Sequence, residues 1–273
     1  MTFELCSYRF RFSALDPISF PPGKAGNVLR GWFGHTLRKI APAEYGRIFE
    51  PRATESGPSG FADRPRPFVF RASALDGLTI EAGQEFWFGI HVFDLRTSII
   101  DHFEAAFAHL NSEGLGPRRG RAALAGVEQS GTVSVPLEAR SERTSRVRVE
   151  FRTPTELKGG GNPADFAVLF CRARDRISML RALYGPGPLE IDFRAMGQRA
   201  SAVRITRSDL TQTQAYRRSS KTGQVHSIGG FTGVAEYEGE LAEFLPYLET
   251  AHWTGVGRQC VWGKGEITVS SAT

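Results

Sequence analysis

The order of expected strands and helices repeats along the chain, and this repetition constrains the fold more than any single motif. Residues 3–12 alternate apolar and polar side chains with one change of phase, which predicts a bulged strand. A helix is expected over residues 27–40, where apolar side chains form one stripe, and a glycine-terminated helix over residues 97–116. The other strands of this half are expected at residues 67–70, 85–95 and 121–129. The order is β-α-β-β-α-β.

The same order returns after residues 134–146, a polar, aperiodic stretch that is expected to be a linker. Strands are expected at residues 147–151, 200–210, 229–239 and 260–269, and helices at residues 165–185 and 240–253. Two such units in tandem indicate an α+β protein made of two ferredoxin-like domains. We expect these domains at residues 1–137 and 146–273, the second with a C-terminal glycine-rich loop.

The composition is that of a folded protein outside the membrane. Hydrophobic residues make up 41% of the 273 residues, and twenty are phenylalanine, so the chain can build real cores. The sequence has neither an apolar run long enough to span a membrane nor a signal peptide, so a soluble intracellular protein is expected. The three cysteines are far apart, without metal-ligand spacing, and are expected to be reduced.

The positive charge is concentrated in one segment. Residues 140–227 carry 17 lysines and arginines against eight carboxylates, whereas residues 1–139 carry 15 of each. Of the 34 basic residues, 29 are arginine, which binds phosphate in a bidentate manner and stacks on bases. A nucleic-acid partner is one interpretation, and a genome that favours arginine codons is the other.

Local motifs for common enzyme classes are missing from the sequence. It contains no P-loop, H-E-x-x-H, Cys/His zinc spacing, acidic magnesium cluster or G-x-S-x-G. This disfavours metal-dependent and serine-hydrolase chemistry, so neither a metal nor a cofactor is expected.

His35 is the first candidate for chemistry. Helical geometry places Asn27, Gly31, Gly34, His35 and Arg38 on the face opposite the apolar stripe, with Lys39 at its edge. An exposed imidazole between cations, with glycines that leave room for another chain, suits proton transfer near a phosphodiester. The alternative is a solvent-facing histidine whose glycines allow the helix to pack.

The other histidines are weaker candidates. His91 alternates with Trp87 and Phe93, which predicts a buried, hydrogen-bonded side chain. His102 and His109 lie on the second expected helix without an evident partner, and His226 is the second candidate.

A polar loop precedes the strand expected at residues 229–239. Its cations, hydroxyl groups and aromatic ring are suited to contacts with an RNA backbone and unstacked bases, although an ordinary solvated hairpin is the alternative. The residues are Tyr216, Arg217, Arg218, Ser219, Ser220 and Lys221.

Four segments between residues 28 and 267 resemble a known family. They are LRGWFGHTLRKI, FRTPTELKGGG, RRSSKTGQVHSIGGFTGVAEYEGEL and GVGRQCVWGKGEI. Their order and spacing resemble those of the CRISPR-associated RAMP-superfamily endoribonuclease that cuts precursor CRISPR RNA within its repeats. One departure is Arg218, where relatives often have tyrosine.

The resemblance implies CRISPR repeat RNA as the partner, together with other CRISPR-associated effector subunits. It implies metal-independent cleavage in which the RNA's 2′-hydroxyl attacks the adjacent phosphate, leaving a 2′,3′-cyclic phosphate and a 5′-hydroxyl. His35 takes the catalytic role, with Lys39, Lys221 or Arg38 stabilising charge. RNA binding falls to the polar loop with His226, to Lys158, and to Arg258 and Lys264 of the glycine-rich loop.

Two other functions are open at this stage. A RAMP-type subunit that binds CRISPR RNA in an effector complex without cutting it would share the fold, the basic loop and the glycine-rich segment. His35 on an open helix face favours the enzyme. A small-molecule enzyme on the same scaffold would need an apolar pocket, for which the sequence gives no positive sign.

Overall fold

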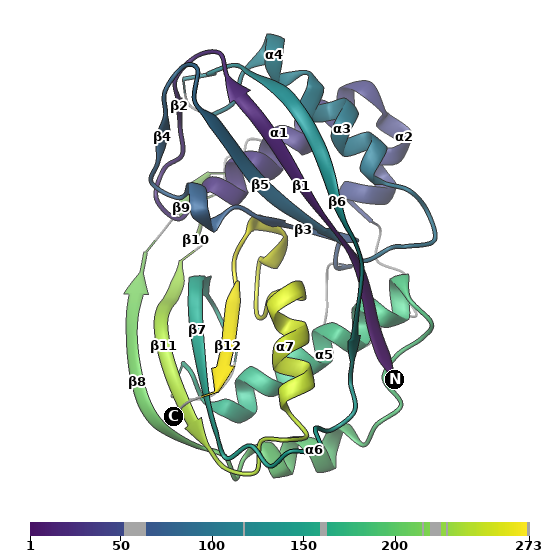
Figure 1. Ribbon diagram of the computed structural model, residues 1–273, viewed down its shortest axis with the longest axis vertical. Coiled ribbons are helices and arrows are strands. Elements are labelled where there is room, and N and C mark those ends of the chain that lie inside the picture. The colour runs from purple at the N-terminus through teal and green to yellow at the C-terminus, as the bar shows by residue number, and fades with distance from the viewer. Residues whose placement is uncertain are drawn as a thin grey trace.

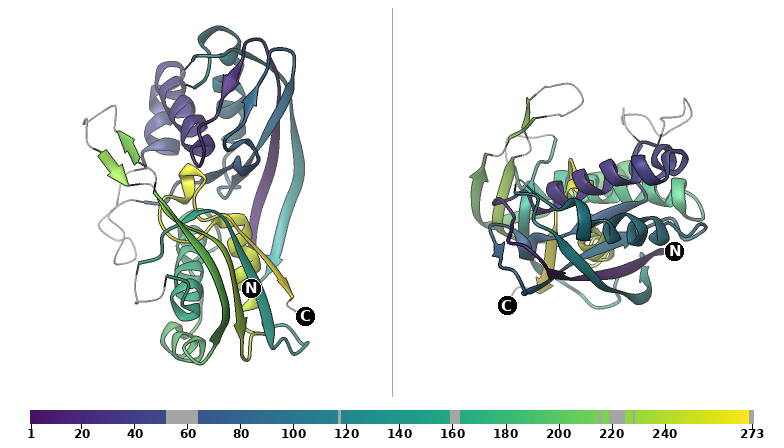
Figure 2. Two further views of the ribbon diagram at one scale, coloured as in Figure 1. Left: turned by 90° about the vertical axis from the view of Figure 1, so that its left-hand side faces the viewer. Right: turned by 90° about the horizontal axis from the view of Figure 1, so that it is seen from above.

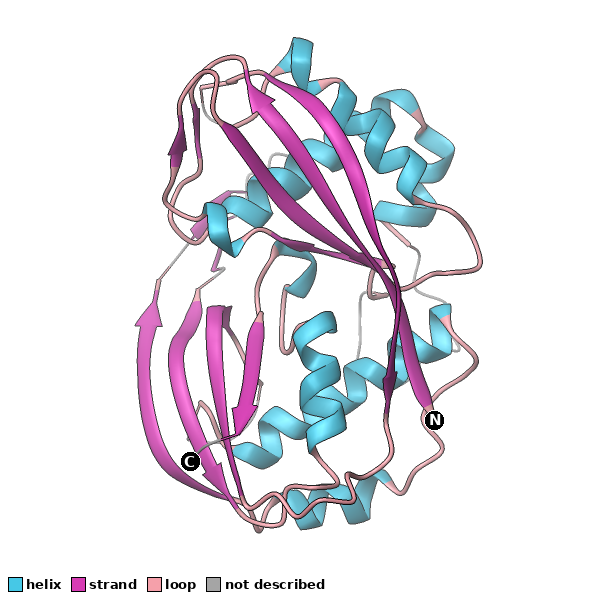
Figure 3. Cartoon of the chain, viewed as in Figure 1, coloured by secondary structure: helices cyan, strands magenta, loops and turns pink. Residues whose placement is uncertain are grey.

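Two four-stranded antiparallel sheets, each with helices packed on one face, form the molecule (Figures 1 and 3). The computed structural model describes residues 1–51, 64–116, 118–158, 163–214, 216–218, 225–227 and 229–271, and for residues 217, 218 and 225–227 it describes the backbone only. Within this part of the chain, none of the helices is long and apolar enough to cross a membrane.

The N-terminal unit has the strand order β3-β5-β1-β6, so the first and third main strands are central and the second and fourth lie at the edges. This is the arrangement of a ferredoxin-like unit, as predicted. The predicted bulge in the first strand is present as a register shift between Cys6 and Tyr8. In chain order the elements are β1 (Thr2–Ala14), β2 (Ile18–Ser19), α1 (Ala25–Ile40), α2 (Pro42–Glu44), the π-helical turn η1 (Tyr45–Phe49), β3 (Phe68–Arg71), η2 (Ser73–Leu75), β4 (Thr79–Ile80), β5 (Glu85–Val92), α3 (Ile100–Ala108), α4 (Leu110–Glu113) and β6 (Ala122–Pro136).

The C-terminal unit repeats this topology with the order β12-β7-β11-β8. It adds a helix that the sequence did not predict, α6, and a short β9–β10 hairpin inserted before β11. Its elements are β7 (Arg146–Thr155), α5 (Phe166–Tyr184), α6 (Phe193–Ala200), β8 (Arg204–Thr213), β9 (Tyr216–Arg218), β10 (Val225–Ser227), β11 (Gly230–Glu238), α7 (Leu245–Thr254), the 3₁₀ turn η3 (Cys260–Trp262) and β12 (Ile267–Ser271).

Several predicted boundaries differ from the observed ones, and two of them change the description of the chain. The strand expected over residues 260–269 begins only at Ile267, because Gly263 and Gly265 adopt φ values of +75° and +67° that turn the chain before it can extend. The expected linker begins inside β6, which continues to Pro136 and pairs with the first residues of β1.

The two hydrophobic cores exchange residues across the junction. Phe3 and Leu5, at the start of β1, pack into the core of the C-terminal unit, whereas Val261 of η3 packs into the core of the N-terminal unit. The C-terminal segment is therefore part of the support of the N-terminal helices.

Candidate RNA-cleaving site

Helix α1, which carries His35, is held by its buried apolar face and by a hydrogen bond at its first residue. Four members of its predicted stripe are fully buried, Leu29, Phe33, Thr36 and Leu37, whereas Trp32 is partly buried and Ile40, at the helix end, is 38% exposed. The Phe33 ring stacks on that of Phe103 in α3 with 3.9 Å between centroids, a contact worth about 1 kcal/mol beyond its buried area. Asp76 Oδ1 accepts the first helical N–H, that of Ala25, at 2.8 Å. Since the helix cannot rotate, its opposite face has a defined orientation.

His35 lies on that opposite face and is exposed. Gly31, one turn earlier, has nothing within 4 Å of the place where a Cβ would be, so the backbone there is open to another molecule. Gly34 differs from the prediction, because a Cβ there would lie 2.3 Å from the ring of Phe49. One of the two glycines leaves the surface open, and the other lets η1 pack closely against the helix.

The two cations next to His35 have contacts within the protein. Lys39 Nζ is 3.1 Å from Glu113 Oε1 of α4, an ion pair at the surface. Arg38 lies with its guanidinium carbon 5.9 Å from the centre of the Tyr45 ring. Neither Glu113 nor Tyr45 was identified from the sequence, since nothing local links them to α1.

The polar loop forms the β9–β10 hairpin, in which Tyr216 pairs with Ser227 and Arg218 with Val225. The hairpin leaves the β8–β11 edge of the lower sheet and reaches the height of α1 (Figures 1 and 2). The Tyr216 side chain is 56% exposed. The predicted contacts of Ser219, Ser220 and Lys221, and the side chains of Arg217, Arg218 and His226, lie outside the described residues.

The glycine-rich segment packs against the first turn of α1. A Cβ on Gly26 would lie 2.7 Å from the Trp262 carbonyl oxygen and 2.9 Å from the Gly263 Cα, so the two backbones meet where neither has a side chain. This contact joins the C-terminal segment to the helix that carries His35.

Lys264 lies inside this junction and not at the surface. Its side chain is 2% exposed and its Nζ donates to the Gly23 carbonyl oxygen at 2.5 Å. Burial lowers the pKa of Lys264, and the Asp76 carboxylate opposes that shift. The expected phosphate contact is therefore replaced by a contact within the protein. Arg258 remains at the surface, paired with Glu156 at 2.7 Å.

Buried polar groups connect the two units below α1. His91 is buried and its Nδ1 lies 2.9 Å from the Trp253 carbonyl oxygen, which confirms the prediction for this residue. Burial, aided by the charge of Arg71, lowers its pKa to about 3, so the imidazole is neutral. Arg71 donates to the carbonyl oxygens of His252 and Trp253, both at 2.8 Å. These contacts close the end of α7 against the N-terminal sheet.

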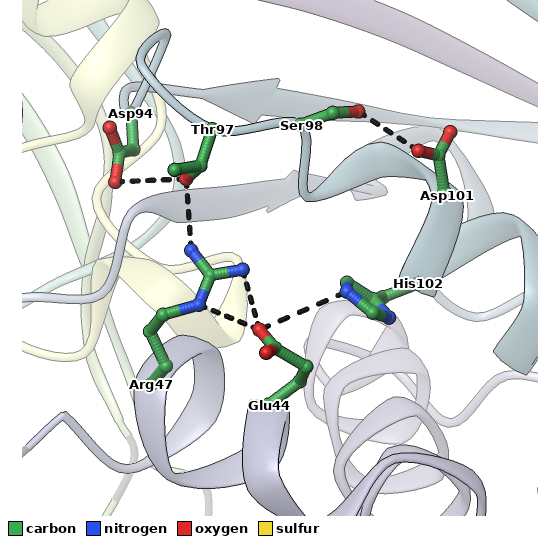
Figure 4. Close-up of polar contacts among 7 residues, drawn as sticks. All are labelled: Glu44, Arg47, Asp94, Thr97, Ser98, Asp101 and His102. Carbon is green, nitrogen blue, oxygen red and sulfur yellow. Dashed lines mark hydrogen bonds and ion pairs between the residues drawn. The ribbon is translucent and has the colours of Figure 1, made fainter.

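A second polar network holds the segment that follows α1 (Figure 4). Arg47 of η1 donates to Glu44 at 2.6 Å and to Thr97 at 2.9 Å. His102 Nε2 lies 3.8 Å from Glu44, so the expectation that this histidine has no partner is wrong. The network ties the turn after α1 to the loop before α3.

Two family models match consecutive parts of the chain. The AF_1859_N model, described as an N-terminal domain, matches residues 3–148, and the model of CRISPR-associated endoribonuclease Cas6 matches residues 149–267. None of the curated proteins is significantly similar in sequence.

Solved structures share the fold at low sequence identity. A Cas6 product complex gives a TM-score of 0.63 at 16% identity, covering 97% of this chain and 100% of that chain. Thermus thermophilus Cas6 gives 0.60 at 15% identity and 99% of both chains. The Cas6-related protein from Pyrococcus furiosus gives 0.53 at 14% identity, covering 98% of this chain and 100% of that chain.

The family models join inside β7, the first strand of the second sheet, and together span residues 3–267, and the solved Cas6 structures have the same tandem fold. The Cas6 family model covers the C-terminal unit, and the solved Cas6 structures share the fold of the whole chain; together these findings indicate a CRISPR-associated RNA-processing protein of the Cas6 family.

Proposed function

We propose that the enzyme cuts precursor CRISPR RNA within its repeats without a metal ion, on the exposed face of α1. The RNA's 2′-hydroxyl oxygen bonds to the adjacent phosphorus while the bond to the 5′-oxygen breaks, which leaves a 2′,3′-cyclic phosphate and a 5′-hydroxyl. The observation that carries the proposal is the position of His35, exposed beside the open backbone of Gly31 on a helix that packing holds rigid.

His35 moves the proton in this scheme. The reaction takes one proton from the 2′-hydroxyl and adds one to the leaving 5′-oxygen. The imidazole performs one of these transfers and water the other, and the imidazole must lie within hydrogen-bond reach of the reacting oxygen. Arg38, on the same face, meets the charge that develops on the phosphate. Lys39 can do so only after it exchanges Glu113 for the phosphate.

The hairpin supplies the RNA contacts nearest to α1. The exposed Tyr216 ring offers a stacking surface for an unpaired base, and the cations and hydroxyl groups of residues 217–221 contribute phosphate contacts. His226 is the reserve candidate for proton transfer.

We also propose domains at residues 1–137 and 146–273, and a cytoplasmic location. A partial Cas6-RT-Cas1–Cas2 complex is among the similar structures, which supports CRISPR-associated protein partners in addition to RNA.

The test uses the repeat RNA of the host in buffer with EDTA. We expect cleavage at one position, blocked by a 2′-deoxy nucleotide immediately before the cut, with a cyclic phosphate on the product. Replacement of His35 by alanine should slow cleavage by about 10² to 10⁴ and leave RNA affinity nearly unchanged. His109→Ala, which removes another exposed histidine of the same unit, is the matched control and should cleave normally.

Each failure has its own meaning. Cleavage that requires a divalent metal ion, or that proceeds past the 2′-deoxy nucleotide, would refute the proposed reaction. Full activity of the His35 variant would remove this residue from the mechanism and direct the search to His226. Tight binding of an uncut RNA would identify a binding subunit.

A further inference from the structure

A groove of about 520 Å³ lies between α5 and α6, on elements that the proposed reaction does not use. In Figure 2 (left) these two helices and α1 lie on the same side of the molecule, at its lower and upper ends. An RNA strand that passes α1 can therefore continue towards this groove without crossing to another face.

The rim of the groove is cationic. Lys158, Arg172 and Arg194 line it, and its lining within the described residues contains no carboxylate. The nearby Asp165 caps α5 by accepting the Val168 N–H at 3.0 Å, and Asp192 caps α6 in the same way. These two carboxylates keep their charge, but three cations line the groove, so the local balance of charge at the rim remains positive.

One of these cations is held in place before any ligand arrives. Arg172 donates from Nε and one Nη to the Lys158 carbonyl oxygen, at 3.1 and 2.7 Å. This bidentate contact fixes the guanidinium at the edge of the groove and positions the backbone of Lys158. A preorganised arginine is well suited to a phosphate, because less side-chain entropy is lost on binding.

The floor of the groove is apolar. Val168, Cys171 and Phe193 contribute to it, and the Cys171 thiol is neutral because burial raises its pKa. Gly197 leaves the floor flat, since a Cβ there would make only an ordinary 3.6 Å contact with Cys171 Sγ. A flat apolar floor beneath a cationic rim matches a nucleotide, with the base below and the phosphate above.

We infer that the α5–α6 groove binds one unpaired nucleotide of the RNA substrate, at a distance from the cleavage position. The inference rests on the proposed function, because the ligand is the same RNA strand. The nucleotide must be single-stranded, since a paired base cannot turn its face to the floor. The groove thus anchors the RNA, and the reaction takes place at α1.

The first test removes charge from the rim. In the Lys158→Ala/Arg194→Ala double variant, the dissociation constant for fluorescently labelled repeat RNA should rise about tenfold at 0.15 M salt. The logarithm of the association constant should also depend less steeply on the logarithm of the salt concentration. The magnitude of this slope should be smaller by about 1.4, the value for two phosphate contacts on a single strand. Arg143→Ala/Arg148→Ala is the matched control, because both arginines are exposed in the same basic segment but lie away from the groove, and its slope should match the wild type.

The second test fills the groove without changing charge. Gly197→Leu places a side chain on the floor of the groove and leaves the helix intact, which far-ultraviolet circular dichroism can show. The affinity for RNA should fall about tenfold. In the wild-type enzyme, bound repeat RNA should slow the reaction of Cys171 with N-ethylmaleimide, while the buried Cys6 and Cys260 stay unreactive.

The outcomes separate the two proposals. Suppose that the wild-type enzyme cleaves the RNA, but that both the rim variant and Gly197→Leu bind it with wild-type affinity and salt slope, or that RNA fails to protect Cys171. RNA binding in the groove is then refuted, and the proposed function stands. If the wild-type enzyme binds repeat RNA with protection of Cys171 but does not cut it, the groove stands and the proposed reaction fails.

Discussion

The exposed face of α1 and the buried junction contain the same kinds of residue in opposite surroundings. The face of α1 presents His35, Lys39 and Gly31 to solvent. The junction encloses His91, Lys264 and Gly265, and Gly265 adopts a φ of +67° that favours glycine. Each set combines an imidazole, an ammonium and a backbone without a side chain.

The difference between the two regions lies in what meets the glycine. At Gly31 the space beside the backbone is empty, so the exposed His35 imidazole faces whatever binds there, and Lys39 can join it once it leaves Glu113. At Gly265 a Cβ would lie 1.9 Å from the Val256 carbonyl oxygen, so the chain itself fills that space. The same residue types thus form a substrate surface in one place and a structural joint in the other.

The largest effect is expected from Gly265→Ala. This position has a φ of +67° and no room for a Cβ, so the backbone must move, and we expect the free energy of unfolding to fall by about 4 kcal/mol. Urea denaturation measures this free energy of unfolding. Gly83→Ala is the control, because Gly83 has a φ of +85° but nothing within 4 Å, and it should lose only about 1–2 kcal/mol. Equal losses would mean that the junction is not tightly packed.

The next effect is a dependence of stability on pH that comes from His91. Its pKa is about 3 in the folded protein against 6.5 as the ordinary value, so below pH 6.5 only the unfolded chain takes up the proton. The free energy of unfolding should therefore be unaffected above pH 6.5 and fall below it, by about 3 kcal/mol between pH 7 and pH 4.5.

The His91→Asn variant isolates this contribution. Its amide can replace the Nδ1 contact with Trp253 but cannot titrate, so denaturation curves measured across the same pH range should be flatter than those of the wild type by that amount. If the two proteins lose stability in parallel as the pH falls, His91 is not the source.

A smaller effect is expected from Lys264→Met, which keeps the volume and removes the ammonium. The Gly23 carbonyl oxygen loses its donor and Asp76 loses a nearby cation, so the free energy of unfolding should fall by about 2 kcal/mol. The salt dependence of RNA affinity, measured where the variant is folded, should not change. A slope lower by about 0.7 would instead place Lys264 at a phosphate.

Patterns within one element could be predicted from the sequence, and contacts between distant elements could not. The stripe of α1, the bulge of β1 and the repeated element order all depend on neighbouring residues, and all three are confirmed. Lys39 meets Glu113, which lies 74 positions away, so the sequence could show only that Lys39 flanks His35. Gly34 was assigned to the open face because the approach of Phe49 depends on the π-helical turn after α2.

The glycine-rich segment shows the same limit more sharply. Its glycines and cations predicted a loop that touches RNA, but the pattern does not show whether the open backbone of a glycine faces a ligand or another part of the chain. Gly26 supplies the missing half of the contact, more than 230 positions earlier in the sequence. Lys264, placed in the same segment, is consequently buried.

The smallest effect, Gly31→Ala, has the opposite sign for stability. A Cβ at this position meets nothing, and alanine is the better helix former by about 1 kcal/mol, so urea denaturation should show a gain of that size. If RNA approaches the helix as closely as the proposed reaction requires, the added methyl group should at the same time weaken cleavage several-fold. Gly46→Ala, at another open position of the same unit, should leave cleavage unchanged. A Gly31 variant that is both more stable and fully active would show that the backbone beside His35 is open but unused.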